Sequence, residues 1–290
     1  MLDAEIDRPA PVQDLSRRDF ITTAVGGSFA AAVLPVTAQT IRTGFDGLTA
    51  GEVAIPVGTF SMPAYRAMPA GKTGLPVVLV VSEIFGVHEY IADVARRFAH
   101  QGYLAIAPEL FVRQGDAQSY GEVAKLVEEV VSKVPDAQVM ADLDACVAWA
   151  GANGGDVARL GVTGFCWGGR ITWLYDAHSP AVKAGVAWYG RLVGAASALQ
   201  PRHPVDVAGQ LHGPVLGLYG GADAGIPVDT IDKMKAALRS GSEAARRSEF
   251  VVYPDAPHAF HADYRPSYRE AAARDGWKRC LAWFKAHGVA

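Results

Sequence analysis

The chain has 290 residues, of which half are hydrophobic and one fifth are charged, and its formal net charge is −3. This size and composition predict one large folded domain. The sequence has no basic stripe of the kind that binds nucleic acid, so we expect no nucleic-acid partner. Three cysteines cannot form a disulfide framework, and no two of them have the C-x-x-C spacing of a zinc site, so we expect no bound metal.

Residues 1–38 have the features of an export signal. A basic pair, Arg17 and Arg18, is followed by Asp-Phe-Ile, by a small and apolar stretch up to Pro35, and by Val36-Thr-Ala38 as a cleavage site. This pattern resembles the twin-arginine type of signal, and its apolar stretch is shorter than the roughly 20 residues of a membrane span.

We therefore expect residues 39–290 to form the folded domain, and we expect the twin-arginine translocase to deliver it to the periplasm or outside the cell. No membrane association is expected after removal of the signal. The alternative is that residues 1–38 are a disordered tail with a chance arginine pair, in which case the protein would be cytoplasmic.

Beyond residue 40, short apolar runs alternate with segments of helical pattern. The predicted strands are an edge hairpin over 52–55 and 61–66, followed by 76–82, 102–107, 159–163, 182–188, 215–219 and 249–253. The predicted helices are 88–100, 120–133, 136–152, 170–175, 228–239 and 268–287, with loop or short helix over 190–213. Alternating strands and helices indicate a single α/β domain with a mainly parallel central sheet that helices cover on both faces.

The segment Gly164-Phe-Cys-Trp-Gly-Gly169 joins a predicted strand to a predicted helix. Such a tight, glycine-bounded turn is typical of a nucleophile elbow, with Cys166 in the place where α/β-hydrolases commonly have serine. The turn would expose the thiol at the carboxyl edge of the sheet and at a helix amino terminus, where the thiolate is favoured. The alternative is a buried structural cysteine, which is how we interpret Cys146 and Cys280, both on apolar helix faces.

Two further groups follow strands in the chain order of an α/β-hydrolase, which is nucleophile, acid and then histidine. Asp223 lies in a Gly-Gly turn after one strand, and His258 follows a later strand through a loop stiffened by prolines. We predict that His258 takes the proton of the thiol and that Asp223 orients His258. The alternatives are Asp229 for the acid, although it fits the first turn of a helix, and His261 for the base.

The oxyanion of an acyl-transfer intermediate requires two backbone N–H donors. In this fold they come from the residue after the nucleophile, Trp167, and from the loop after the strand that begins at Pro76, where Ile84 is the candidate. Both donors are backbone groups, so side-chain substitution would test them poorly.

Together these motifs resemble the dienelactone hydrolase family. The resemblance rests on Ser-Glu-Ile-Phe-Gly-Val at 82–87, Gly-Phe-Cys-Trp-Gly-Gly at 164–169, Asp223 and Pro-His-Ala-Phe at 257–260, and it covers residues 50 to 290. It implies a single-domain α/β-hydrolase fold and the opening of the lactone ring of dienelactones to give maleylacetate. It also implies a catalytic triad of Cys166, His258 and Asp223.

The same resemblance implies roles for three more residues. Glu83 would hydrogen-bond the resting cysteine and take its proton when substrate binds, which a buried carboxyl of raised pKa can do. Arg113 and Arg265 would bind the carboxylate of the substrate, a task that suits the planar guanidinium group.

We therefore predict a carboxylic ester hydrolase that acts through a thioester acyl-enzyme on a small, carboxylate-bearing molecule, either a dienelactone-type lactone or a small ester. No cofactor is implied, and we expect a monomer. The first alternative is a general exported carboxylesterase with a non-lactone substrate. The second is a ligand-binding module that keeps the fold without the chemistry.

Overall fold

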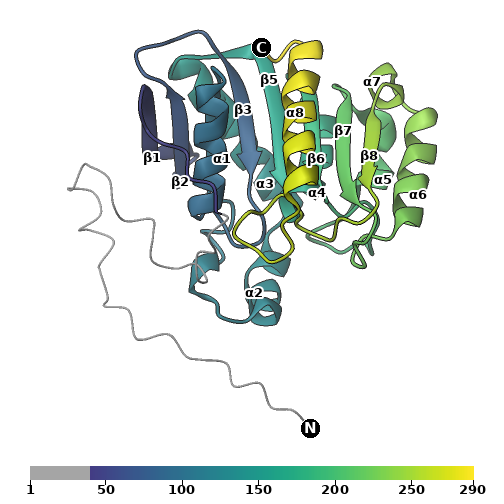
Figure 1. The fold of residues 1–290 in the computed structure, drawn as a ribbon. Helices are drawn as coiled ribbons and strands as arrows, with labels where there is room; N and C mark the ends of the chain where they lie inside the picture. The colour runs from purple at the N-terminus through teal and green to yellow at the C-terminus, as the bar shows by residue number, and fades with distance from the viewer. Residues whose placement is uncertain (1–39) are drawn as a thin grey trace. The chain divides into compact units, whose positions relative to one another are not determined.

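The structure, a computed structural model, describes residues 40–290 (Figure 1). The export signal expected over 1–38 lies outside the described residues. Within the described part of the chain, an eight-stranded sheet has the order β1-β2-β4-β3-β5-β6-β7-β8. The strands are β1 (Leu48–Val57), β2 (Phe60–Pro69), β3 (Leu75–Val81), β4 (Leu104–Pro108), β5 (Gly155–Phe165), β6 (Val182–Trp188), β7 (Val215–Gly220) and β8 (Glu249–Tyr253).

The strands from β3 to β8 pair in parallel, whereas β1 and β2 form an antiparallel hairpin that is joined to the sheet by the pairing of β2 with β4. This arrangement confirms the predicted mainly parallel α/β sheet. The hairpin strands are longer than expected because their pairing continues from Leu48 opposite Pro69 to Val57 opposite Phe60.

Eight α-helices lie in the part of the chain that the structure describes. They are α1 (Glu89–His100), α2 (Val123–Glu129), α3 (Asp136–Ala152), α4 (Trp167–His178), α5 (Pro204–Val207), α6 (Val228–Arg239), α7 (Glu243–Arg246) and α8 (Glu270–Ala286). The single helix expected over 120–133 is divided, because Val130 leaves helical geometry with φ −120° and ψ −66°, and a 3-10 turn follows over Val131–Lys133. Among these described helices, none is long and apolar enough to cross a membrane.

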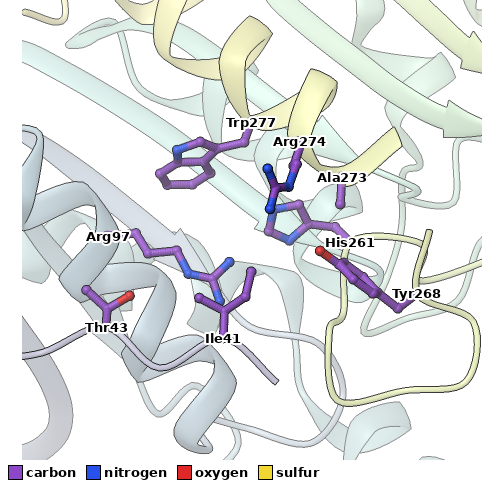
Figure 2. A pocket seen from close by; sticks show the side chains of 8 residues that line it. All are labelled: Ile41, Thr43, Arg97, His261, Tyr268, Ala273, Arg274 and Trp277. Carbon is purple, nitrogen blue, oxygen red and sulfur yellow. The ribbon is translucent and has the colours of Figure 1, made fainter. Parts of the chain in front are cut away.

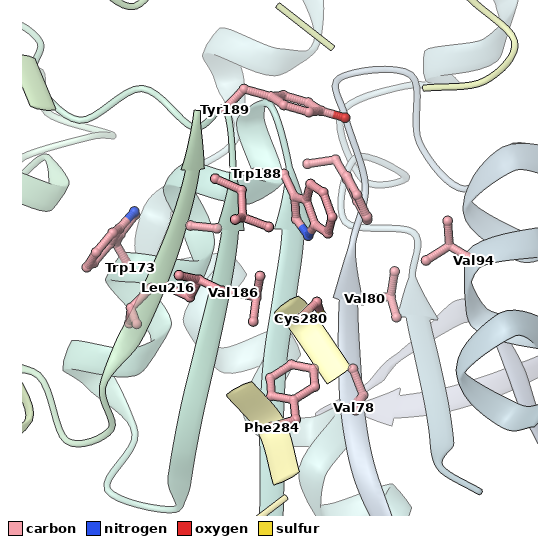
Figure 3. Close-up of a cluster of buried hydrophobic side chains, with 14 of the residues drawn as sticks. Val78, Val80, Val94, Trp173, Val186, Trp188, Tyr189, Leu216, Cys280 and Phe284 are labelled. Atoms are coloured by element: carbon pink, nitrogen blue, oxygen red, sulfur yellow. The ribbon is translucent and has the colours of Figure 1, made fainter. Parts of the chain in front are cut away.

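The two faces of the sheet bury separate hydrophobic clusters. Along β3, Val78 and Val80 belong to the cluster that includes α1 and α8, whereas Val77 and Leu79 belong to the cluster that includes α3 and α4. Figure 3 shows the first cluster, in which Phe284 of α8 lies over the sheet. The alternation along β3 explains its continuous apolar sequence, because both faces of a covered strand must be hydrophobic.

The turn from β5 into α4 is held by direct backbone contact. A Cβ atom on Gly164 would lie 2.1 Å from the carbonyl oxygen of Gly168, and one on Gly168 would lie 2.2 Å from the carbonyl oxygen of Val81. A Cβ atom on Gly169 would lie 2.5 Å from the carbonyl oxygen of Trp188. The glycines therefore allow the carboxyl ends of β3, β5 and β6 to meet at the turn.

We expect Gly168→Ala to lower the free energy of unfolding by at least about 2 kcal/mol, or to prevent folding, because the new Cβ would meet backbone that cannot rotate away. Urea denaturation followed by circular dichroism would measure the change. Gly209→Ala is the control, because its Cβ would find its nearest neighbour at 3.7 Å. Equal stability of the two variants would contradict the backbone contact at the turn.

Candidate active site

Cys166 lies at the end of β5 and is the N-cap residue of α4, as the elbow motif predicts. Its φ of 54° is unusual for a residue other than glycine, and its N–H donates to the carbonyl oxygen of Trp188 at 3.0 Å. Cys166 is half-buried, whereas Cys146 and Cys280 are fully buried, and burial raises the pKa of both of those thiols. Of the three cysteines, Cys166 is therefore the one that a substrate can reach.

The structure brings the candidate nucleophile, base and acid together. His258 Nδ1 lies 2.6 Å from Asp223 Oδ2, and the second carboxylate oxygen of Asp223 accepts a hydrogen bond from the Gly225 N–H at 2.9 Å. His258 also interacts with Cys166, which contributes to raising the pKa of the imidazole. This arrangement matches a series of thiol, general base and orienting carboxylate, in which the carboxylate fixes the tautomer of the histidine.

Neither alternative that the sequence leaves open takes part in this arrangement. Asp229 is exposed, and its carboxylate pairs with Lys233 at 2.9 Å on the surface of α6. His261 is buried, and its Nδ1 lies 2.6 Å from the hydroxyl oxygen of Tyr90. Burial lowers the pKa of His261 well below its ordinary value, so this imidazole is neutral.

His258 is held in its protonated form. Burial by itself lowers the pKa of this imidazole, but the hydrogen bonds and charges of Asp223 and Cys166 outweigh burial and raise it to about 10. A protonated imidazole at this position can donate a proton to a leaving group.

Glu83 lies just beyond the end of β3 and is fully buried. Its Oε2 accepts a hydrogen bond from the Tyr264 hydroxyl at 2.7 Å, and its Oε1 lies 3.8 Å from Nη1 of Arg265. Burial raises the pKa of the Glu83 carboxyl, and Tyr264, Arg265 and His258 offset part of this effect. Among the hydrogen bonds of residues 40–290, the Glu83 carboxyl is paired with Tyr264 and not, as the resemblance implies, with the Cys166 thiol.

The two predicted oxyanion donors belong to neighbouring backbone segments. A Cβ on Gly168 would lie 2.6 Å from the carbonyl oxygen of Ser82, which places the loop that carries Ile84 against the elbow that carries Trp167. Within residues 40–290, the backbone N–H groups of Ile84 and Trp167 donate to no protein partner outside regular secondary structure. Both N–H groups are therefore available to a developing oxyanion.

The two arginines expected to bind a substrate carboxylate have different surroundings. Arg113 makes two hydrogen bonds to the buried Asp142 carboxylate, at 2.7 and 2.8 Å, and its guanidinium lies 4.3 Å from the centre of the Phe60 ring. Arg265 is one-third exposed and lies beside Glu83. Of the two guanidinium groups, only that of Arg265 is joined to the residues around the thiol, whereas Arg113 is already occupied by a protein carboxylate.

Two tyrosines in this region are absent from the sequence-based prediction. Tyr189 follows β6 directly, has a φ of 38°, and packs edge to face on His258 with ring centres 5.2 Å apart. Its position one residue beyond a predicted parallel strand is a signal that could have revealed it, because ligands bind at that edge of the sheet. Tyr264 has no such signal, since only the folded loop after His258 brings its hydroxyl to Glu83.

A cavity of about 200 Å³ lies elsewhere in the fold (Figure 2). It is lined by Ile41, Thr43, Arg97, His261, Tyr268, Ala273, Arg274 and Trp277. Cys166, His258, Asp223 and Glu83 do not line it, although the alternative base His261 does, and Arg97 is tied to Asp93 and Asp263 by ion pairs. We therefore place the candidate chemistry at the elbow and not in this cavity.

A parallel sheet with a nucleophile elbow after β5, an acid after β7 and a histidine after β8 is the arrangement of α/β-hydrolases. The family model of the dienelactone hydrolase family matches residues 62–288 of this chain. The chain therefore belongs to the dienelactone hydrolase family, which confirms the resemblance predicted from the motifs.

Known relatives agree with this assignment. The chain is 62% identical over 290 residues to a Methylorubrum extorquens protein provisionally named carboxymethylenebutenolidase, covering 99% of each chain. It is 54% identical over 269 residues to a Salmonella typhimurium protein of the same provisional name, covering 92% of this chain and 98% of that protein. A solved structure from Klebsiella pneumoniae, provisionally named dienelactone hydrolase, has 58% identity and a TM-score of 0.80, covering 83% of this chain and 99% of that one. These likenesses confirm the predicted α/β-hydrolase fold and a hydrolase of the dienelactone hydrolase type.

We expect Asp223→Asn to lower the pKa of His258 from about 10 toward its ordinary value, because an amide stabilises the imidazolium less than a carboxylate does. Titration of the imidazole resonances by NMR would measure the change, with His261 as an internal control that stays neutral. The raised pKa makes protonation of His258 stabilise the fold below pH about 6.5, and this contribution is lost as the pH rises through about 10. A wild-type His258 that titrates at its ordinary value would contradict the pairing.

Proposed function

We propose that this protein is a carboxylic ester hydrolase that opens a dienelactone-type carboxylated lactone, or cleaves a small ester, by acyl transfer to Cys166. The observation that carries the proposal is the 2.6 Å pairing of His258 with Asp223 at the edge of the sheet where the half-buried Cys166 forms the elbow. A protein that only binds a ligand has no need of thiol, base and orienting carboxylate in this order. The provisional name of the relatives, carboxymethylenebutenolidase, agrees with this class of substrate.

The proposed reaction has two acyl-transfer steps. The Cys166 thiolate attacks the carbonyl carbon of the ester, and the N–H groups of Ile84 and Trp167 stabilise the oxyanion. When the carbon–oxygen bond breaks, the imidazolium of His258 gives its proton to the leaving alkoxide, which stays attached to the acyl group if the substrate is a lactone. Water then attacks the thioester while His258 takes the water proton, and the carbon–sulfur bond breaks to release the acid.

Arg265 is the residue that we propose as the partner of a substrate carboxylate. Its guanidinium is one-third exposed, lies 3.8 Å from Glu83, and is 5.7 Å from the centre of the Phe85 ring. A substrate anion would meet a positive group beside Glu83 without having to break a buried bidentate ion pair. For Arg113 to bind the same anion, it would first have to give up its two hydrogen bonds to Asp142.

The pairing of Arg113 with Asp142 favours a second candidate function, hydrolysis of uncharged esters. With one arginine already occupied, selection for a carboxylate rests on Arg265 alone. An ester without a second negative group would then meet no electrostatic penalty at the site. Both candidate functions use the same acyl-transfer chemistry and differ only in how the substrate is chosen.

Kinetics of variants would separate the two functions. We expect Cys166→Ala to abolish hydrolysis of both a carboxylated dienelactone and a neutral short-chain aryl ester. We expect Arg265→Gln to raise the KM for the lactone by about tenfold or more and to leave the ester little changed, because a charge-assisted hydrogen bond contributes about 1.5–3 kcal/mol. Arg269→Gln is the matched control, since this exposed arginine of the same loop bonds the backbone carbonyl groups of Pro266 and Tyr268 and no side chain within residues 40–290.

The outcomes of these assays are distinct. Turnover of the lactone with a KM that depends on Arg265 supports the carboxylated-lactone function. Turnover of the aryl ester alone supports the general esterase. Turnover of neither substrate by the wild-type protein would contradict the proposed hydrolase and favour a ligand-binding role.

We further propose that residues 1–38 direct export of this protein by the twin-arginine translocase to the periplasm. Changing both Arg17 and Arg18 to lysine should leave an uncleaved precursor in the cytoplasm of a Gram-negative host, because the paired guanidinium groups are the feature read by that route. Cell fractionation and immunoblotting would measure this. Arg8→Lys, outside the pair, is the control, and mature protein in the periplasm from the doubly substituted variant would contradict the proposal.

A further inference from the structure

The cavity of about 200 Å³ that lies away from the elbow has room for a small molecule (Figure 2). Three parts of the chain meet around it: the segment before β1, helix α1, and the loop after β8 together with the first turns of α8. An apolar cavity of about 150 Å³ in a protein can bind benzene. This cavity is therefore large enough for a molecule with one aromatic ring.

The wall formed by the segment before β1 is held in place by side chains of α1. Oγ1 of Thr43 donates to Oδ2 of Asp93 at 3.1 Å, and Nε of Arg96 donates to the carbonyl oxygen of Thr43 at 3.0 Å. Nε2 of His100 lies 3.0 Å from the carbonyl oxygen of Gly44. These contacts fix the segment on α1, so the cavity has a defined shape on this side.

Most of the wall is apolar or aromatic, with the side chains of Ile41, Ala273 and Trp277 and the ring of Tyr268. The ring centres of Trp277 and His261 lie 6.2 Å apart. Aromatic rings attract one another in offset and edge-to-face arrangements. A flat aromatic ligand therefore suits this wall better than a chain of polar groups.

One polar atom of the wall is without a protein partner. His261 is 2% exposed, its Nδ1 lies 2.6 Å from the hydroxyl oxygen of Tyr90, and its Nε2 has no hydrogen-bond partner within residues 40–290. Nε2 is not among the side-chain atoms that are sealed from the surface without a partner, so it can be reached from the cavity that the ring lines. The imidazole is fixed by Phe165 and Trp188, whose ring centres lie 5.3 and 4.4 Å from its own.

The two arginines of the wall are both paired with carboxylates. Arg97 lies 2.5 Å from Asp93 and 2.6 Å from Asp263, and Arg274 lies 2.8 Å from Glu270. A negatively charged ligand would have to compete with these partners, whereas an uncharged ligand leaves them in place. The wall therefore favours an uncharged molecule.

A hydroxyl group complements Nε2 of His261 in either tautomer. Burial lowers the pKa of this imidazole well below its ordinary value, so the ring is neutral and carries one proton. If the proton is on Nδ1, Nε2 accepts a hydrogen bond from the ligand hydroxyl; if it is on Nε2, this atom donates to the hydroxyl oxygen. One ring with one hydroxyl thus matches the size, the wall and the polar atom of the cavity.

We propose that this cavity is a binding site for a small, uncharged phenol, with the ligand hydroxyl on Nε2 of His261 and the ligand ring against Trp277. The site is separate from the elbow, and the proposal does not depend on the role of Cys166.

Titration of the full chain with phenol, followed by NMR of the Trp277 indole and His261 imidazole resonances, tests the proposal. We expect saturable shifts with a Kd of about 1 mM or below. Ala273→Leu should weaken binding by about tenfold or more, because the added carbons would take up the space of the ligand ring. Ala271→Leu is the matched control, since it makes the same change at an exposed position of α8 that does not line the cavity.

Toluene tests the hydrogen bond to His261, because it has nearly the size of phenol and lacks the hydroxyl. In His261→Asn no atom stands at the place of Nε2, whereas the amide can still reach toward Tyr90. The preference for phenol over toluene should fall by about three- to tenfold in this variant. A general loosening of the cavity would weaken both ligands together and leave the preference unchanged.

Three results would each overturn the proposal: no saturable shift in the wild type, equal binding of phenol by Ala273→Leu, or an unchanged preference in His261→Asn. Cys166→Ala should bind phenol as the wild type does, and weaker binding in this variant would place phenol at the elbow instead. These measurements record binding alone. Failure of the proposed hydrolase function would therefore leave this site standing, and failure of this site would leave the hydrolase function standing.

Discussion

The backbone contact at the turn between β5 and α4 is the constraint on which the rest of the site depends. Gly164 meets Gly168, Gly168 meets the carbonyl oxygen of Val81, and Gly169 meets that of Trp188, each with no room for a Cβ atom. These contacts join the carboxyl ends of three central strands. Cys166 is thereby forced into a backbone conformation that few residues other than glycine adopt, and its side chain is lifted to the edge of the sheet.

The pKa values of the groups at this edge are set by burial and by the charges and hydrogen bonds of their neighbours. His258 has a raised pKa because Asp223 and Cys166 outweigh the effect of burial, whereas Glu83 has a raised pKa because burial outweighs its neighbours. The two shifts have opposite meanings, since one favours an imidazolium and the other an uncharged carboxyl. The site therefore contains two titratable groups whose pKa values are raised for different physical reasons.

The two arginines that the family resemblance assigns to substrate binding have different surroundings in this chain. Arg113 stands at a position where the family is expected to bind a substrate carboxylate, but here its guanidinium is paired with Asp142 of α3. Arg265 belongs to the same loop as His258 and Tyr264 and reaches Glu83. Selection of an anionic substrate, as we propose it, therefore depends on the loop after β8 and not on the segment after β4.

The sequence by itself determined the α/β class, the family and the elbow, because continuous apolar runs and close-packed glycines are local features with one structural solution. It also indicated that Cys166, Asp223 and His258 lie near one another. Each of them follows a predicted strand, and the carboxyl ends of parallel strands lie at one edge of the sheet. Only the tertiary structure decided that His258, not His261, contacts Asp223, that Arg113 is occupied, and that Tyr264 bonds Glu83. Those contacts join residues far apart in sequence or on irregular loops, where no periodic pattern records the direction of a side chain.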